Sequence, residues 1–517
     1  MKKILLVLSV LVFAFYSFQL YKVTVNYAQT DRFVDENDHM IGGYFLLKGK
    51  KLYKDISVVH QPLNYYFGSV GQKIFKVNSL FSFINRQRLM IMLYSLSWNF
   101  LFLVFFGPAA ILFMLIFEIS KFWFLGNLLL GETLAVYPLL FLFGMIIKKL
   151  FFKAELKHFE LVMFSVATFT ATFILLQLWP TIFLLNLAML FSYRKNLKNI
   201  ICLLSPFALL TVILFIFVPF KYYIQEVFVY NFRYYLPYMS KINGFMGYVK
   251  MIFLPLTSFH KNFNSMEMMV IILTFIYIYL FYFFWKKKNL PAFLFLVACI
   301  ILTNNRGNMI NYNDFHLLPW LGAYIFFPIM LLPLLFKKKM KVKPLISIGV
   351  VTIILLLIIF VNFFAKTPFK NKKNVMSEND INFHDINKYG MAIKAIRSPG
   401  DRLIAIPSDN LIHWVSETDL ATRQIEYYGW QYSIKEDKER LINVFKNHPA
   451  EFIVNGDSAN SLPSFVKDYV DEKYIQITEQ NKPSRLFVLK SILPRISDDQ
   501  WKTFEYLLFE KPINVTP

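Results

Sequence analysis

Long apolar runs separated by short polar segments dominate residues 1–364. A helix needs roughly 20 apolar residues to cross ~30 Å of hydrocarbon, because each residue adds about 1.5 Å. About eleven runs approach this length. They cover residues 4–22, 88–106, 108–123, 131–147, 158–178, 180–193, 199–219, 266–285, 289–303, 316–336 and 344–364. The pattern predicts a polytopic α-helical membrane domain.

Residues 365–517 have a different pattern, with frequent charges and apolar runs of strand length. Leu403 to Ile406 follows a Pro-Gly-Asp turn signal. Residues 452–455 follow an expected helix that ends near Lys446, and residues 485–489 form a third short run. Strands that alternate with helical segments indicate a small C-terminal α/β domain.

Clusters of Lys and Arg cap the apolar runs and predict an orientation, because such clusters favour the cytoplasmic side. They are residues 2–3, 148–153, 194–198, 286–288 and 337–343. With eleven spans and a cytoplasmic N-terminus, every cluster falls on the cytoplasmic side. Residues 23–87, 221–265 and 304–315, together with the C-terminal domain, are then extracytoplasmic. We expect a multi-pass protein of a bacterial-type plasma (inner) membrane, with an uncleaved first span because no small-x-small site follows it.

Composition supports the membrane interpretation and argues against two others. Hydrophobic residues make up 56% of the 517 residues and charged residues 17%, whereas soluble domains are about one-quarter charged. The net charge of +22 raises the question of nucleic acid binding, but many lysines cap apolar segments, so no nucleic acid partner is expected. Both cysteines lie inside apolar segments, which leaves no disulfide framework or zinc spacing.

The first outer loop carries a dense acidic cluster that includes Asp35 and Glu36, followed by His60-Gln61. Carboxylates held near a membrane surface can have altered proton affinity and act as general bases. The alternative is a solvated loop with ordinary surface charges.

Three further positions are candidates for chemistry on the same side. Glu132 lies at the outer end of an expected span, where an acid is costly unless it faces a cavity, a partner or water. It can equally complement a helix dipole. Arg306 can bind a phosphate, and His316 can bind a substrate or cap the next span.

Residues 221–265 mix aromatic side chains with basic ones such as Arg233. This mixture suits lipid headgroups and polyprenyl phosphates, and also a plain aromatic belt.

The order of these features resembles the GT-C membrane glycosyltransferases of the protein-mannosyltransferase and aminoarabinose-transferase type. The resemblance rests on Asp35-Glu36, Gly49…Tyr53…Asp55 and His60-Gln61-Pro62-Leu63, followed by Gly131-Glu132, the segment that begins at His316, and the C-terminal layout. It covers nearly the whole chain in layout, through short motifs. Asn37-Asp38-His39 departs from the family pattern, and no phosphate-binding basic motif has a clear counterpart.

The resemblance implies transfer of a sugar from a polyprenyl-phosphate donor to a lipid, glycan or protein acceptor. Asp35, with Glu36 and Glu132, is then the expected catalytic group. A leaving phosphate needs positive charge, so we expect Arg306 and Arg233 as substrate ligands, together with His316, His60 and Gln61. No cofactor is specified, and a divalent metal stays open. Two other functions remain: a lipid or glycan transporter or flippase, and a GT-C-like glycan polymerase or ligase.

Overall fold

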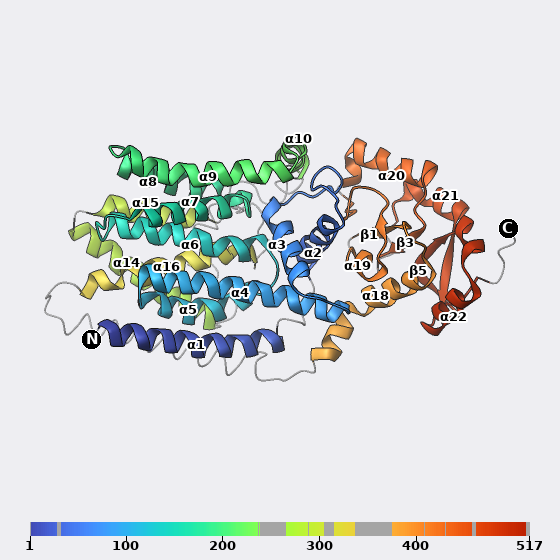
Figure 1. Cartoon of the computed structure of the whole chain (residues 1–517), viewed down its shortest axis with the longest axis horizontal. Coiled ribbons are helices and arrows are strands. Elements are labelled where there is room, and N and C mark those ends of the chain that lie inside the picture. Colours follow the sequence, from blue (N-terminus) through green and yellow to red (C-terminus); the bar gives the residue numbers. More distant parts are fainter. Residues whose placement is uncertain are drawn as a thin grey trace.

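The computed structural model describes residues 2–27, 33–235, 237, 265–287, 289–303, 315–336, 375–407, 409–429, 431–456 and 462–512. Figure 1 shows two parts along the long axis: a helical bundle that holds the N-terminus, and a smaller part that holds the C-terminus. The bundle and the segments next to it contain α1 (Lys2–Tyr27), α2 (Val34–Leu47), α3 (Pro62–Ile74), α4 (Leu80–Phe106), α5 (Ala109–Ser120), η1 (Lys121–Phe124), α6 (Gly131–Leu150), α7 (His158–Thr172), η2 (Leu176–Leu178), α8 (Trp179–Tyr193), α9 (Leu197–Phe217), α10 (Phe220–Tyr223), η3 (Ile224–Tyr235), α14 (Ser265–Lys286), α15 (Leu290–Leu302), η5 (Phe315–Leu317) and α16 (Leu318–Phe336).

In the described part of the chain, six helices are long and apolar enough to cross a membrane. They are residues Leu80–Phe106, Gly131–Leu150, Leu176–Tyr193, Leu197–Phe217, Met269–Lys286 and Phe315–Leu334. Three shorter apolar helices occupy Val10–Thr24, Ala109–Ser120 and Leu290–Leu302. The predicted run at 344–364 lies outside the described residues. The total of about eleven spans therefore stays a prediction from the lengths of the apolar runs.

Helix α6 forms the centre of the bundle. Every residue from Gly131 to Ile147 is buried, and α4, α7, α8 and α16 pack against this helix. Helix α9 is the opposite case, since only 11% of its apolar window is buried, against 83% for α6. Exposed apolar side chains such as Ile216 and Phe217 are unfavourable in water but compatible with lipid.

The polar segment 23–87, expected as a loop, is largely helical. Helix α1 extends to Tyr27 and α4 begins at Leu80, and between them α2 and α3 pack against each other. Glycine permits this close packing, because a Cβ on Gly68 would lie 2.6 Å from the backbone oxygen of His39. The segment 221–265 also begins as helix, in α10 and the π-helix η3, and most of the rest of it lies outside the described residues.

The C-terminal part is a five-stranded mixed sheet with helices around it. The strand order is β2-β1-β3-β5-β4, with β2, β1 and β3 parallel and β5 antiparallel to both β3 and β4. The three predicted strands are confirmed as β1, β3 and β5, and the predicted helix is α20. Its elements are α18 (Val375–Ile396), β1 (Arg402–Ile406), α19 (Ile412–Ser416), β2 (Asp419–Leu420), η7 (Gln431–Ser433), α20 (Lys435–Asn447), β3 (Phe452–Asn455), α21 (Ser464–Lys473), β4 (Tyr474–Glu479), β5 (Lys482–Leu489), η8 (Lys490–Arg495) and α22 (Asp498–Tyr506).

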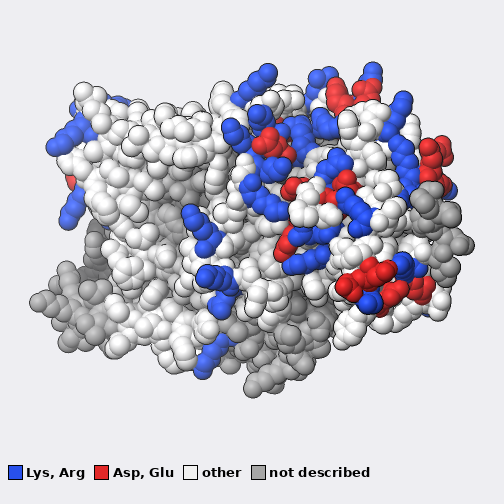
Figure 2. All heavy atoms as spheres, turned by 45° about the vertical axis from the view of Figure 1, so that its right-hand side comes forward, with Lys and Arg blue, Asp and Glu red and all other residues white. Residues whose placement is uncertain are grey.

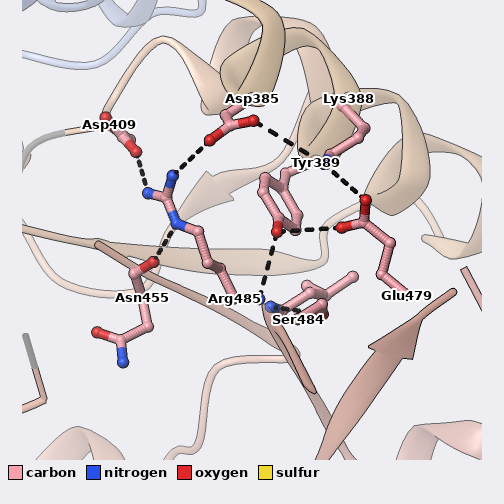
Figure 3. Close-up of polar contacts among 9 residues, drawn as sticks. Asp385, Lys388, Tyr389, Asp409, Asn455, Glu479, Ser484 and Arg485 are labelled. Carbon is pink, nitrogen blue, oxygen red and sulfur yellow. Dashed lines mark hydrogen bonds and ion pairs between the residues drawn. The ribbon is translucent and has the colours of Figure 1, made fainter. Parts of the chain in front are cut away.

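A network around Arg485 fastens α18 to this sheet (Figure 3). Its Nη1 lies 3.1 Å from Asp385 Oδ2, its Nε donates to the Asn455 carbonyl at 2.6 Å, and its Nη2 pairs with Asp409. Lys388 on α18 pairs with Glu479 at 2.9 Å. We call these side chains, Asp385, Lys388, Asp409, Glu479 and Arg485, the Arg485 network.

The C-terminal part contacts the segments that connect the bundle helices. Trp414 stacks on Phe83 of α4 with ring centroids 4.7 Å apart. Arg423 pairs with Glu226 of η3 and donates to the Tyr53 carbonyl at 3.0 Å. The contacts of Arg423 hold its loop in the C-terminal part against η3 and the loop that precedes α3.

The surface also distinguishes the two parts. Figure 2 shows charged side chains gathered over the C-terminal part, whereas the flank of the bundle on this face is mainly uncharged, with basic groups at its far end. This distribution is compatible with a bundle in lipid and a C-terminal part in water.

Candidate functional site

A small cavity lies where α2, the start of α3, the start of α6 and η5 meet. Its volume is about 230 Å³, counting the part open to solvent. The lining residues are Asp35, His39, His60, Leu130, Gly131, Glu132, Leu175 and His316. Four predicted site residues, Asp35, His60, Glu132 and His316, therefore share one cavity although the chain separates them widely.

Helix α2 supplies one polar face of the site. Asp35, Asp38 and His39 are spaced three and four residues apart, so they project from the same side of a helix. Asp38 and His39 are 4% and 1% exposed. Acidic groups at the first turn also suit the positive end of the helix dipole.

Glu36 points to a different neighbour and fixes the position of α2. Its carboxylate forms a two-point ion pair with Arg88 of α4, with Nη2–Oε2 at 2.6 Å and Nε–Oε1 at 3.1 Å. The backbone N–H of Leu129 donates to the same Oε1 at 3.1 Å. Both side chains are essentially unexposed. The predicted catalytic residue Glu36 thus binds α4 and the start of α6, and it does not line the cavity.

His39 is held in one tautomer. Its Nδ1 lies 2.7 Å from the carbonyl oxygen of Leu129, and a carbonyl only accepts, so Nδ1 carries the proton. Burial, with a smaller effect of His60, lowers the pKa of His39 to about 4, so the ring is neutral at pH 7. Nε2 keeps its lone pair, and this buried atom has no hydrogen-bond partner in the part of the chain that the structure describes.

Asp38 and His60 lie next to that ring. The rings of His39 and His60 meet edge to face, with centroids 4.9 Å apart, and the Tyr65 hydroxyl donates to Asp38 Oδ2 at 2.7 Å. Burial raises the pKa of Asp38 to about 7, and nearby Asp35 adds to this shift against the Tyr65 hydrogen bond. Asp38, His39 and His60 each offer a ligand atom, all within 4.8 Å of one another, and could hold a metal ion.

Glu132 and His316 form a buried pair that lines the same cavity. His316 Nδ1 and Glu132 Oε1 lie 2.6 Å apart, and the two residues are 8% and 5% exposed. Glu132 is in the first turn of α6, and His316 is in η5, which leads into α16. An imidazole bonded to a carboxylate is an arrangement that can transfer a proton.

The C-terminal part contributes one carboxylate beside the cavity, Glu426. Burial is the main cause that raises the pKa of Glu426 well above its usual value, and the charges of Asp38 and Asp35 raise it further. Its Oε1 has no hydrogen-bond partner among the described residues. We call Asp35, Asp38, His39, His60, Glu132 and His316 the cavity cluster, with Glu426 next to it.

The remaining predicted ligands lie elsewhere or outside the described residues. Gln61 is buried and accepts from the Tyr223 hydroxyl at 3.0 Å, so it joins the α3 start to α10. Arg233 is exposed on η3, over the ring of Tyr234. Arg306 lies outside the described residues.

Sequence reasoning missed the roles of Asp38, His39, Arg88 and Glu426. A helix assigned over residues 34–47 would have shown that Asp38 and His39 share a face with Asp35. Arg88 was counted within an apolar run, where a lone cation is itself a signal. Glu426 had no local signal, because only the tertiary fold brings it to α2.

Comparisons with known proteins add no assignment: no family model, no curated protein and no solved structure matches the chain. The proposals below therefore depend on the site itself and on the resemblance in motif order.

Proposed function

We propose that the protein is a membrane glycosyltransferase that transfers a sugar from a polyprenyl-phosphate donor to a lipid, glycan or protein acceptor at the extracytoplasmic face. The observation that carries the proposal is the shared cavity, in which Asp35 and the Glu132–His316 pair meet at one end of the helical bundle. Carboxylates and imidazoles gathered at one end of an apolar helical bundle suit a substrate with a lipid tail and a sugar head.

Asp35 is the proposed general base. It takes the acceptor's proton while the acceptor oxygen attacks the anomeric carbon and the polyprenyl phosphate leaves, as in the base step of inverting glycosidases. The departing phosphate needs positive charge or a proton, and His316, which lines the same cavity and is bonded to Glu132, can supply either. Arg88 and Glu36 are positioning residues in this scheme, since they hold α2 in place.

The distribution of basic residues supports an extracytoplasmic site. Lys149 at the end of α6 lies 4.3 Å from the ring of Tyr193 at the end of α8. Phe151 packs on Phe284 near the end of α14, with ring centroids 4.9 Å apart. The described basic residues within 148–153, 194–198 and 286–287 thus gather at the end of the bundle away from Glu132, which lies in the first turn of α6. The positive-inside rule would put that basic end in the cytoplasm.

The direct test is Asp35→Asn in reconstituted protein, with polyprenyl-phosphate sugars as donors and transfer of labelled sugar as the readout. Loss of a general base should lower the rate by at least about 100-fold. Asp499→Asn is the matched control, because its side chain is 90% exposed on α22, and it should keep full activity. Full activity of a folded Asp35→Asn variant would refute the assignment of Asp35.

The two other functions give different outcomes in the same vesicles. Movement of the lipid-linked sugar across the bilayer without transfer would indicate a transporter or flippase. Transfer of a whole glycan from a lipid diphosphate would indicate a polymerase or ligase. A tag at residue 400 that is accessible only from the cytoplasm would contradict the orientation on which the proposal depends.

A further inference from the structure

We propose that Asp38, His39 and His60 form a binding site for one divalent transition metal ion of the zinc class. Two imidazoles and one carboxylate are a ligand set typical of zinc sites that keep a position open. Hard cations such as Mg²⁺ and Ca²⁺ prefer oxygen ligands, so they are not the expected occupants.

His39 is already arranged as a ligand. It is 1% exposed, its Nδ1–H is committed to the Leu129 carbonyl at 2.7 Å, and its Nε2 has no partner in the described part of the chain. Metal-binding histidines commonly donate their second nitrogen to a carbonyl in this way, which fixes the ring and raises its basicity. A buried imidazole lone pair without a partner is otherwise an unfavourable feature.

Asp38 has a similar support. The Tyr65 hydroxyl donates to its Oδ2 at 2.7 Å, which orients the carboxylate and leaves Oδ1 for a ligand. The ring of Tyr65 also packs edge to face on His39, with centroids 5.3 Å apart. One tyrosine therefore fixes both neighbouring ligands, which lie in sequence on α2.

The distances allow a metal ion after a small contraction. The three ligand atoms lie within 4.8 Å of one another, whereas ligands about 2.1 Å from a tetrahedral zinc lie about 3.4 Å apart. His60 can close this gap, because it belongs to the loop before α3 and is only partly buried. The backbone of His60 is held in place by the Tyr53 hydroxyl, which donates to its carbonyl at 2.8 Å.

The charges around the site also favour a cation. Asp35 and Glu132 line the cavity with His39 and His60, and none of the described lining residues is Lys or Arg. Binding of the metal does not depend on the proposed transferase activity. If that activity holds, an ion here would lie beside Asp35 and would supply positive charge to a phosphate or hydroxyl oxygen in the same cavity.

The test measures zinc in the full-length protein, purified without a polyhistidine tag, by elemental analysis and by titration of the metal-stripped protein. We expect one zinc per chain, and bound Co²⁺ should give the visible absorption of a nitrogen-ligated ion. His60→Gln and Asp38→Asn should each weaken zinc affinity at least about tenfold. His448→Gln, at an exposed histidine, should leave the affinity unchanged, and Mg²⁺ should not compete.

Two results would overturn the proposal. One is a wild-type protein that binds no zinc at micromolar concentration. The other is unchanged affinity in both His60→Gln and Asp38→Asn, which would put the ion elsewhere. His60→Gln keeps the test decisive if Asp38→Asn misfolds, because His60 lies in a loop and the Tyr53 hydroxyl donates to its backbone carbonyl, which glutamine retains. Loss of zinc with retained glycosyl transfer would leave the proposed function standing. Bound zinc without any glycosyl transfer would support the metal site and contradict the proposed function.

Discussion

The Arg485 network and the cavity cluster are both made of charged and polar side chains held between helices and adjoining segments. In the Arg485 network, two cations face three carboxylates, and Nε, Nη1 and Nη2 of Arg485 each have an acceptor. In the cavity cluster, three carboxylates face imidazoles, and His39 Nε2 has no partner among the described residues. Matched groups stabilise a fold, whereas buried unmatched groups cost free energy and persist mainly at functional sites. We therefore interpret the Arg485 network as structural, and we expect chemistry at the cavity cluster.

The largest change in stability should follow Arg88→Met, which removes the cation beneath the cavity cluster. Glu36 would then be a buried carboxylate without its ion pair, a change that costs about 3–5 kcal/mol. Helix α2 would lose its attachment to α4, so transfer and zinc binding should both fall. Thermal unfolding in detergent and limited proteolysis would measure the loss, and an unchanged midpoint would contradict a positioning role for this pair.

Arg485→Met should destabilise the C-terminal part by about 3 kcal/mol, because Asp409 and Asp385 lose their shared partner. Cleavage within residues 375–512 of the full-length protein would report the change. Arg495→Met is the matched control, since Arg495 also pairs with an aspartate, Asp401, but is 41% exposed. It should cost about 1 kcal/mol or less. Loss of zinc binding in a folded Arg485→Met protein would contradict the view that the Arg485 network acts separately from the cavity cluster.

A smaller effect should appear as a pH dependence of the junction. Burial, with a further contribution from Lys48, lowers the pKa of His413 to about 3, and its ring packs on Phe45 of α2. In the unfolded chain His413 binds a proton below its ordinary pKa of about 6.5, whereas in the folded chain it stays neutral until the pH approaches 3. The free energy of unfolding therefore falls as the pH decreases from about 6.5. Between pH 8 and pH 5 this group should remove about 2 kcal/mol.

His413→Gln should flatten that part of the stability curve, while His448→Gln, at an exposed position, should leave it as in the wild type. Unfolding midpoints across this pH range provide the measurement. Parallel curves for wild type and His413→Gln would show that His413 is not buried in its neutral form.

The fold was predictable from the sequence where one local property decides the outcome. The ten apolar runs that fall in the described residues all coincide with helices, and the strand-length runs became β1, β3 and β5. Strand β2 has two residues, which is too short to show an alternation of apolar and polar side chains. Strand β4 does alternate, but it lies in a polar stretch and was missed. Residues 34–47 were missed as a helix, because their charges and paired glycines are typical of a loop.

The candidate site was predictable only in part from single residues, and not as an arrangement. Four predicted residues line the cavity, whereas Glu36, Gln61 and Arg233 do not. Asp35, Glu132 and His316 were each selected for carrying charge or imidazole at the expected membrane surface. Their convergence depends on the packing of α2, α6 and η5, which no local pattern encodes. The contact of Leu129 with both Glu36 and His39 is made by its backbone, so side-chain identity gave no indication of it.

A structure with a bound polyprenyl phosphate would show whether the cavity cluster is the active centre of a glycosyltransferase. Electron cryomicroscopy of the full-length protein in nanodiscs with this lipid would locate the phosphate. We expect phosphate oxygens about 3 Å from a side chain of the cavity cluster, with the lipid tail along the bundle helices. A phosphate bound instead against the exposed faces of α8 or α9, away from Asp35 and His316, would contradict this expectation.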